Sequence, residues 1–156
     1  MGAPFDSIFG LSAVAFNLLI SVVLAAWRVG KPTLARKLGA GLVALGLPFG
    51  AVLYHTLTAG RSLYVRVALA AVLAYILTEL LLDFILKYDF RARFITHFPY
   101  ILLEYAAFVG LIYVAFTISD PWGWAVSITF WLAMGALIYY LTGNKKPAQK
   151  MKKKKR

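Results

Sequence analysis

Five long apolar stretches, separated by short charged connections, most strongly constrain how this 156-residue chain can fold. They cover residues 8–27, 38–58, 65–86, 98–119 and 122–141. A helix needs about 20 mostly apolar residues to cross about 30 Å of hydrocarbon, and each stretch reaches that length. Hydrophobic residues make up 62% of the chain, against about 45–50% in an average soluble protein. The sequence therefore predicts an all-α integral membrane protein, with residues 1–142 forming a bundle of five transmembrane helices.

Basic residues are distributed unequally over the connections. Of the 17 Lys and Arg residues, 15 lie between the first and second stretches, between the third and fourth, or after the fifth. Only Arg61 and Arg66 lie on the other side. Because cytoplasmic connections carry the excess of basic residues, we expect the N-terminus outside and the C-terminus in the cytoplasm. Only Asp6 is charged before the first stretch and no cleavage signature follows it, so a retained span is expected rather than a signal peptide.

Residues 143–156 read G-N-K-K-P-A-Q-K-M-K-K-K-K-R and have no apolar face to bury. We predict a disordered, polybasic cytoplasmic tail. Attraction to anionic lipid headgroups, worth about 1 kcal/mol per basic residue near the surface, is the preferred interpretation. Docking to a polyanion is the alternative. The tail has no aromatic residue that could stack on a base, so no nucleic-acid partner is expected.

Missing residues argue against several kinds of chemistry. The chain has no cysteine, which excludes disulfides, thiol nucleophiles and thiolate metal sites. Its two histidines, His55 and His97, are expected at opposite ends of the bilayer, which disfavours a haem or a histidine-rich metal site. The H-E-x-x-H, G-x-S-x-G and P-loop motifs are absent. We predict no catalytic residue, no metal and no cofactor, and a function other than that of an enzyme is favoured.

Three acidic residues, Glu79, Asp83 and Glu104, fall inside the predicted spans. Ionisable groups in hydrocarbon are costly, so each is a candidate functional residue. At α-helical spacing, Glu79 and Asp83 share one face with Tyr75, and Lys87 extends this face. His97, Tyr100 and Glu104 form a second stripe on the next span.

A short polar turn centred near residues 91 and 92 joins these two spans, so they are expected to pack as an antiparallel hairpin. Residues equidistant from the turn then face each other. This register places Glu79 opposite Glu104 and Asp83 opposite Tyr100. The two glutamates would lie at one depth, about 12 Å inside the cytoplasmic end at about 1.5 Å per residue.

Two carboxylates this close in a low dielectric cannot both remain charged, so they share a proton or bind a cation. The sequence therefore predicts a proton- or cation-handling transporter or channel component. The predicted ion- or proton-binding residues are Glu79, Glu104 and Asp83, supported by Tyr75, Tyr100, His97 and Lys87. Five short helices enclose little volume, so a homo-oligomer or a membrane-protein partner is also expected.

Simpler roles for the acids stay open. Asp83 and Lys87 form an acid-then-base pair that would neutralise itself, and Glu104 could extend toward Arg93. Glu79 could be protonated and hydrogen-bonded to Tyr75. The chain would then be a non-catalytic accessory or assembly subunit of a larger membrane complex. A lipid-modifying enzyme that uses the two glutamates as acid and base has no support beyond these acids themselves.

Other features predict helix packing. Pro48 lies inside the second stretch and should free the carbonyl of Ala44, so a kink is expected there. Asn17 is expected to hydrogen-bond between helices, and His55 to lie at the outer interface. Small residues suited to close helix contact are Gly46, Gly50, Ala106 and Gly110.

Overall fold

The computed structural model describes residues 3–86 and 94–142, and these ranges form helices without any strand. The helices are α1 (Ala3–Arg28), α2 (Pro32–Ala44), α3 (Gly46–Thr58), α4 (Leu63–Glu79), α5 (Phe94–Ile118) and α6 (Asp120–Leu141). A π-helical segment, η1 (Leu80–Ile85), continues α4. The predicted polybasic tail and the polar turn near residues 91 and 92 lie outside the described residues.

Five helical runs are long and apolar enough to cross a membrane. They are Pro4–Arg28, Pro32–Thr58, Leu63–Leu82, Phe98–Ile118 and Asp120–Leu141. The predicted all-α architecture with five membrane-length helices is thereby confirmed, as expected of a multi-pass membrane protein.

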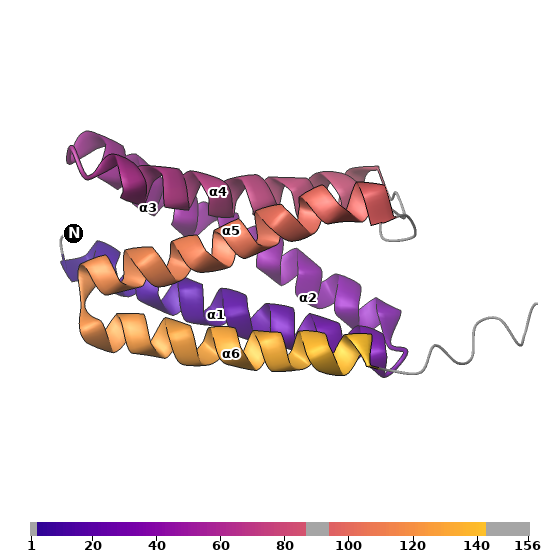
Figure 1. The fold of residues 1–156 in the computed structure, drawn as a ribbon. Coiled ribbons are helices and arrows are strands. Elements are labelled where there is room, and N and C mark those ends of the chain that lie inside the picture. Colours follow the sequence, from indigo (N-terminus) through magenta and orange to yellow (C-terminus); the bar gives the residue numbers. More distant parts are fainter. Residues whose placement is uncertain (1–2, 87–93, 143–156) are drawn as a thin grey trace, which may run out of the picture.

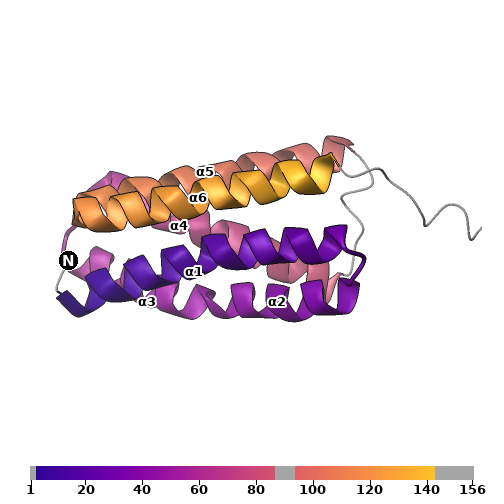
Figure 2. The ribbon, with the colours of Figure 1, turned by 90° about the horizontal axis from the view of Figure 1, so that it is seen from below.

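Successive membrane-length runs are antiparallel, whereas α1 and α6 run in the same direction (Figures 1 and 2). α1 packs along α6, α6 along α5, and α5 along α4. The second membrane-length run consists of α2 and α3, and its two halves have different neighbours. α2 packs mainly on α1, whereas α3 packs on both α4 and α1. Below, the basic end is the end of the bundle that carries Arg28, Lys31, Arg36 and Lys37, and the opposite end is the N-terminal end.

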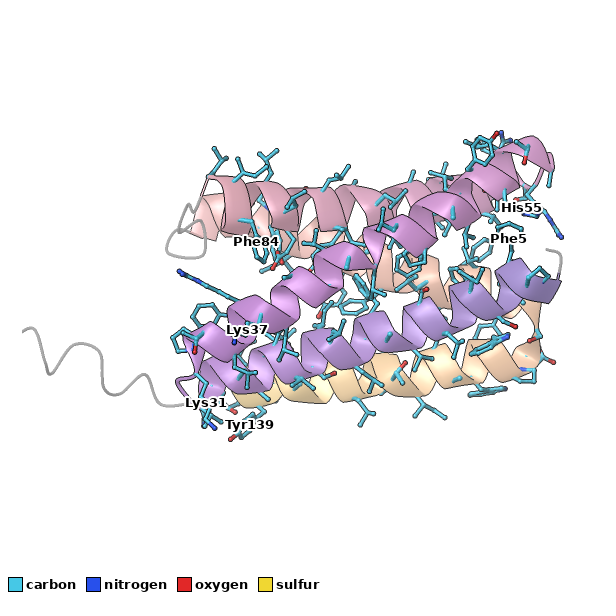
Figure 3. All side chains as sticks on the ribbon, turned by 180° about the vertical axis from the view of Figure 1, so that it is seen from behind. Phe5, Lys31, Lys37, His55, Phe84 and Tyr139 are labelled. Carbon is cyan, nitrogen blue, oxygen red and sulfur yellow. The ribbon has the colours of Figure 1, made fainter. Side chains whose placement is uncertain are left out.

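A break at Leu45 separates α2 from α3 and allows this change of partner. Pro48 has no N–H group, so the carbonyl of Ala44 loses its usual helical donor. The amide of Leu45 is shared between the carbonyls of Gly41 and Leu42, at 3.3 and 3.2 Å. The kink expected from Pro48 is therefore observed. The α2–α3 run crosses the bundle diagonally, from α1 to α4 (Figure 3).

Glycine ends two of the helices. Gly30 and Gly60 have φ angles of 73° and 62°, a left-handed conformation that costs other residues more. In each turn, the amide after the glycine bonds to a carbonyl five residues earlier, at 3.0 and 3.1 Å. This arrangement satisfies the last carbonyls of α1 and α3 and reverses the chain within a few residues.

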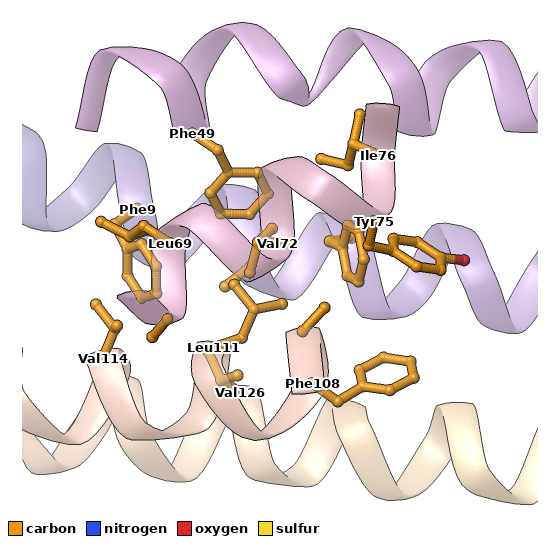
Figure 4. Close-up of a cluster of buried hydrophobic side chains, with 14 of the residues drawn as sticks. Phe9, Phe49, Leu69, Val72, Tyr75, Ile76, Phe108, Leu111, Val114 and Val126 are labelled. Carbon is orange, nitrogen blue, oxygen red and sulfur yellow. The ribbon is translucent and has the colours of Figure 1, made fainter. Parts of the chain in front are cut away.

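Aromatic and branched side chains fill the interior (Figure 4). Phe16 makes edge-to-face contacts with Phe49, Tyr75 and Phe108, with ring centroids 6.1, 5.7 and 6.0 Å apart. Phe16, Phe49 and Phe108 are called the aromatic layer below, and each is at most 1% exposed. Contacts of this geometry are worth about 0.5–1.5 kcal/mol beyond the burial of area.

The outer surface of the bundle is apolar. Leu47, Tyr64 and Trp131 are among its most exposed large side chains, at 81%, 74% and 70%. Exposed apolar surface this extensive is suited to contact with lipid rather than with water.

Candidate functional site

Glu79 is the last residue of α4, and its side chain is only 7% exposed. It lies about 24 Å along the helix from Leu63, at about 1.5 Å per residue. Most of the buried side chains around it are apolar. A carboxyl in such a place must be hydrogen-bonded, protonated or both.

Two tyrosine hydroxyls form a short hydrogen-bond chain that ends at Glu79. The hydroxyl of Tyr100 on α5 donates to Oε2 of Glu79 at 2.5 Å. The hydroxyl of Tyr75, one turn before Glu79 on α4, lies 2.9 Å from that of Tyr100. A phenol has one hydrogen, and Tyr100 gives its own to Glu79, so Tyr75 donates to Tyr100. The chain therefore runs from Tyr75 through Tyr100 to the carboxylate.

The chain is enclosed by protein. Tyr75 and Tyr100 are 3% and 7% exposed, and their ring centroids lie 5.5 Å apart. In Figure 4, Tyr75 lies at the edge of the apolar cluster. The hydrogen bond from Tyr100 therefore satisfies a carboxyl oxygen of a buried side chain.

Glu104 is the second acid near this chain. It is half-buried on α5, one turn after Tyr100, and it interacts electrostatically with Tyr75. The structure thus brings Glu79, Glu104, Tyr75 and Tyr100 into one neighbourhood between α4 and α5.

The pairing of α4 with α5 differs from the predicted register. Tyr100 lies beside Tyr75 and Glu79, whereas the symmetric hairpin placed it opposite Asp83. A Cβ added to Gly110 would lie 3.2 Å from Ala68, which indicates the same displacement further along the pair. Tyr100 is therefore a hydrogen-bond partner of Glu79.

The displacement agrees with the observed start of α5. α5 starts at Phe94, four residues before the predicted start at Phe98, and Pro99 lies inside the helix. An earlier start moves the centre of the connection toward α4 and shifts every opposed pair by about one turn. Hydropathy alone did not indicate these additional helical residues.

The π-helical segment begins directly after Glu79. In η1 the backbone bonds span five residues, as in the 2.8 Å bond from the Leu86 amide to the Leu81 carbonyl. The α-helical spacing that placed Glu79 and Asp83 on one face does not apply across such a segment. π-Helical turns are frequent at functional sites, yet no residue pattern in the sequence indicated this one.

Three of the predicted site residues cannot be placed. The side chains of Asp83 and His97, and the whole of Lys87, lie outside the described residues. Among described side chains, no group of three or more His, Asp or Glu residues converges as metal ligands would.

The other polar residues singled out by sequence lie apart from Glu79. The amide nitrogen of Asn17 donates to the Val126 carbonyl and the Thr129 hydroxyl of α6, at 3.1 and 3.0 Å. The expected interhelical role of Asn17 is thus observed. His55 stacks on Phe5, with ring centroids 4.0 Å apart, at the N-terminal end (Figure 3).

The small residues predicted to pack helices have different surroundings. Gly110 contacts Ala68, and a Cβ on Gly46 would lie 3.4 Å from Ile76. Gly50 has no neighbouring atom within 4 Å of such a Cβ, and Ala106 is exposed. If Gly50 and Ala106 mediate helix packing, their partners would therefore belong to another molecule.

A shallow pocket at the N-terminal end is separate from the carboxyl neighbourhood. Val65 in its wall lies about 21 Å along α4 from Glu79, at about 1.5 Å per residue. The pocket is lined by Arg61, Ser62, Val65, Tyr113, Thr117 and Ile118.

Comparison with known proteins gives no relative: no protein-family model, curated protein or solved structure matches this chain.

Proposed function

We propose that this chain is a multi-pass membrane protein that binds and moves protons, with Glu79 as the proton-binding group. The observation that carries this proposal is the buried chain of hydroxyls from Tyr75 through Tyr100 to Glu79. A phenol both donates and accepts a hydrogen bond, so such a chain can reverse its direction when the carboxyl gains a proton. Ionisable residues within spans commonly serve proton relays, which supports the same role.

The geometry favours a proton over a metal cation. The hydrogen of Tyr100 points at Glu79 Oε2 and occupies one of the acceptor positions that a cation would otherwise use. A hard cation also requires several oxygen ligands, whereas a proton requires one carboxyl oxygen and one hydrogen-bond partner. Glu104 would assist by its negative charge near Tyr75. We place the basic end in the cytoplasm, on the basis of the positive-inside rule.

Proton flux in vesicles tests this proposal. The purified chain is reconstituted with a pH-sensitive dye inside, and a membrane potential is imposed. Wild-type protein should acidify or alkalinise the lumen according to the sign of the potential. Glu79→Gln keeps the size of the side chain but cannot release a proton, so its flux should fall to that of protein-free vesicles. Glu104→Gln should lower the flux less.

Asp120→Asn provides the matched control, because Asp120 is an exposed acid at the far end of the bundle. Its flux should equal that of wild type. Undiminished flux with Glu79→Gln would contradict the proposal. Flux of Na⁺ or K⁺ in place of H⁺ would show that the transported ion is a metal cation and not a proton.

An accessory role in a larger membrane complex is the second candidate. The observation that favours it is the exposed apolar face of α6, where Ile128, Trp131 and Leu132 are 59%, 70% and 56% exposed. Native mass spectrometry after gentle extraction distinguishes the two candidates. A transporter should appear as a multiple of this chain, whereas an accessory subunit should retain a second polypeptide in fixed ratio.

A further inference from the structure

Packing differs on the two sides of the carboxyl neighbourhood. Toward the N-terminal end, the large side chains below 2% exposure come from five helices and, apart from Asn17, are apolar. Toward the basic end, Phe84 of η1 is only half-buried, and its ring lies against Gly39 of α2. Figure 1 shows α5 close to α1 at the N-terminal end and apart from it at the basic end. Among the described residues, the largest fully buried side chains are therefore concentrated on the N-terminal side of Tyr75.

Phe16 occupies the centre of this group. Its ring contacts Tyr75, which carries the first hydroxyl of the hydrogen-bond chain, at a centroid distance of 5.7 Å. It also contacts Phe49 of α3 and Phe108 of α5 at 6.1 and 6.0 Å. One side chain of α1 thus contacts side chains of three other helices in the interior, directly next to the hydrogen-bond chain that ends at Glu79.

No hydrogen-bond path continues past this layer among the described residues. Apart from Glu79, the buried polar side chains among the described residues are Ser12 and Thr56, toward the N-terminal end, and Asn17, at the level of the layer. The amide nitrogen of Asn17 bonds to α6, and Thr56 donates to the Leu53 carbonyl of its own helix. No hydrogen bond joins any of the three to Tyr75. A proton needs a chain of donors and acceptors, so the aromatic layer blocks its transfer.

We propose that the aromatic layer, with Phe16 at its centre, is the barrier that separates Glu79 from the N-terminal side. This inference rests on the proposed function. In the observed conformation, this layer separates Glu79 from water on the N-terminal side. Displacement of the Phe16 ring would open the route from Tyr75 to the other side, so the position of Phe16 determines the direction of release.

Passive proton leak in the same vesicles tests the barrier. Phe16→Ala removes the ring that bridges Phe49, Tyr75 and Phe108. We expect the leak to rise about tenfold, which corresponds to about 1.4 kcal/mol of lost barrier. Adding Glu79→Gln to Phe16→Ala should return the leak to background, because the proton would still have to pass through Glu79. Phe16→Leu keeps apolar atoms in the layer and should remain close to wild type.

Two further variants keep the result interpretable. Phe108→Ala opens the same layer from α5 and is measured in parallel, in case Phe16→Ala does not fold. Phe116→Ala, at a residue that is 40% exposed, is the control and should not leak. An unchanged leak in the folded layer variants would overturn the barrier, as would a leak that persists with Glu79→Gln. Failure of the proposed function is distinct, because it would appear as undiminished driven flux in Glu79→Gln alone.

Discussion

The hydroxyl of Tyr100 contacts both Glu79 and Tyr75, so one side chain connects α5 to two polar residues of α4. Hydrogen bonds to a charged group are worth about 1.5–3 kcal/mol, roughly twice the value for neutral pairs. The bond to Glu79 therefore offsets part of the cost of keeping a carboxylate among apolar side chains.

Replacing Tyr100 by phenylalanine removes this donor and keeps the ring. We expect Tyr100→Phe to lower proton flux about tenfold or more, since about 1.4 kcal/mol of lost stabilisation corresponds to a factor of ten. Flux in reconstituted vesicles is the measurement. Tyr64→Phe is the matched control, because Tyr64 is 74% exposed, and it should leave the flux unchanged. Equal flux in both variants would show that the Tyr100 hydroxyl takes no part in proton movement.

Asn17 fastens α1 to α6 but leaves its own carbonyl oxygen without a hydrogen-bond partner in the described residues. The stabilisation from these two hydrogen bonds is thus partly offset by the cost of burying one unsatisfied acceptor. We expect Asn17→Ala to lower the free energy of unfolding by about 0.5–2 kcal/mol, the range for hydrogen bonds between membrane helices. Unfolding in mixed detergent micelles measures this. Ser21→Ala, whose bond is within α1, should have a smaller effect.

Close contacts between helices depend on where glycine meets its neighbours. Gly110 lies against the backbone of Ala68, which brings α5 near α4 and positions Tyr100 beside Glu79. A Cβ at Gly10 would overlap the ring of Trp122, so the contact between α1 and α6 requires a glycine there. Sequence analysis proposed Gly110 but missed Gly10, because the aromatic ring that fills its place belongs to a distant segment.

Enlarging Gly110 tests the α4–α5 contact. Gly110→Leu should push the two helices apart and cost about 1–3 kcal/mol, the usual range for overpacking. It should also reduce proton flux, since the separation would lengthen the bond from Tyr100 to Glu79. Gly135→Leu is the control, because no atom lies within 4 Å of a Cβ there. A stable, fully active Gly110→Leu protein would show that this contact does not set the register.

The bundle has two unlike ends, one basic and one with few charges. The positive-inside rule predicts that the basic end lies in the cytoplasm, and this orientation would also set the side from which Glu79 is loaded. An inverted protein would keep every contact described above and would reverse the direction of proton entry.

Labelling with a membrane-impermeant maleimide tests the orientation. The chain has no cysteine, so single cysteines can be introduced without background. Ser62→Cys lies between α3 and α4, and Thr33→Cys lies in the first turn of α2; both residues are exposed. In intact cells we expect Ser62→Cys to react and Thr33→Cys to react only after permeabilisation. The opposite labelling pattern would show that the protein has the inverted orientation in the membrane.

Sequence reasoning predicted some parts of the site better than others. It named Glu79, Tyr75 and Tyr100, because costly polar residues stand out in an apolar span. It did not place Tyr100 on Glu79, because a symmetric hairpin was assumed and α5 starts earlier than hydropathy indicates. η1 was missed as well, since apolar residues with α-helical propensity fill it.

The sequence by itself determined that five apolar helices form, where the second one breaks, and that Glu79 and Glu104 lie within membrane-length helices, whereas Asp83 lies just past the end of the third run. Each follows from local physics: backbone groups in hydrocarbon must bond within the helix, proline lacks a donor, and charge in lipid is costly. Only the tertiary structure decided that Tyr100 bonds Glu79 and that Phe16 covers Tyr75. These contacts depend on the relative displacement of packed helices, and a shift of one turn changes every opposed pair while leaving hydropathy unchanged.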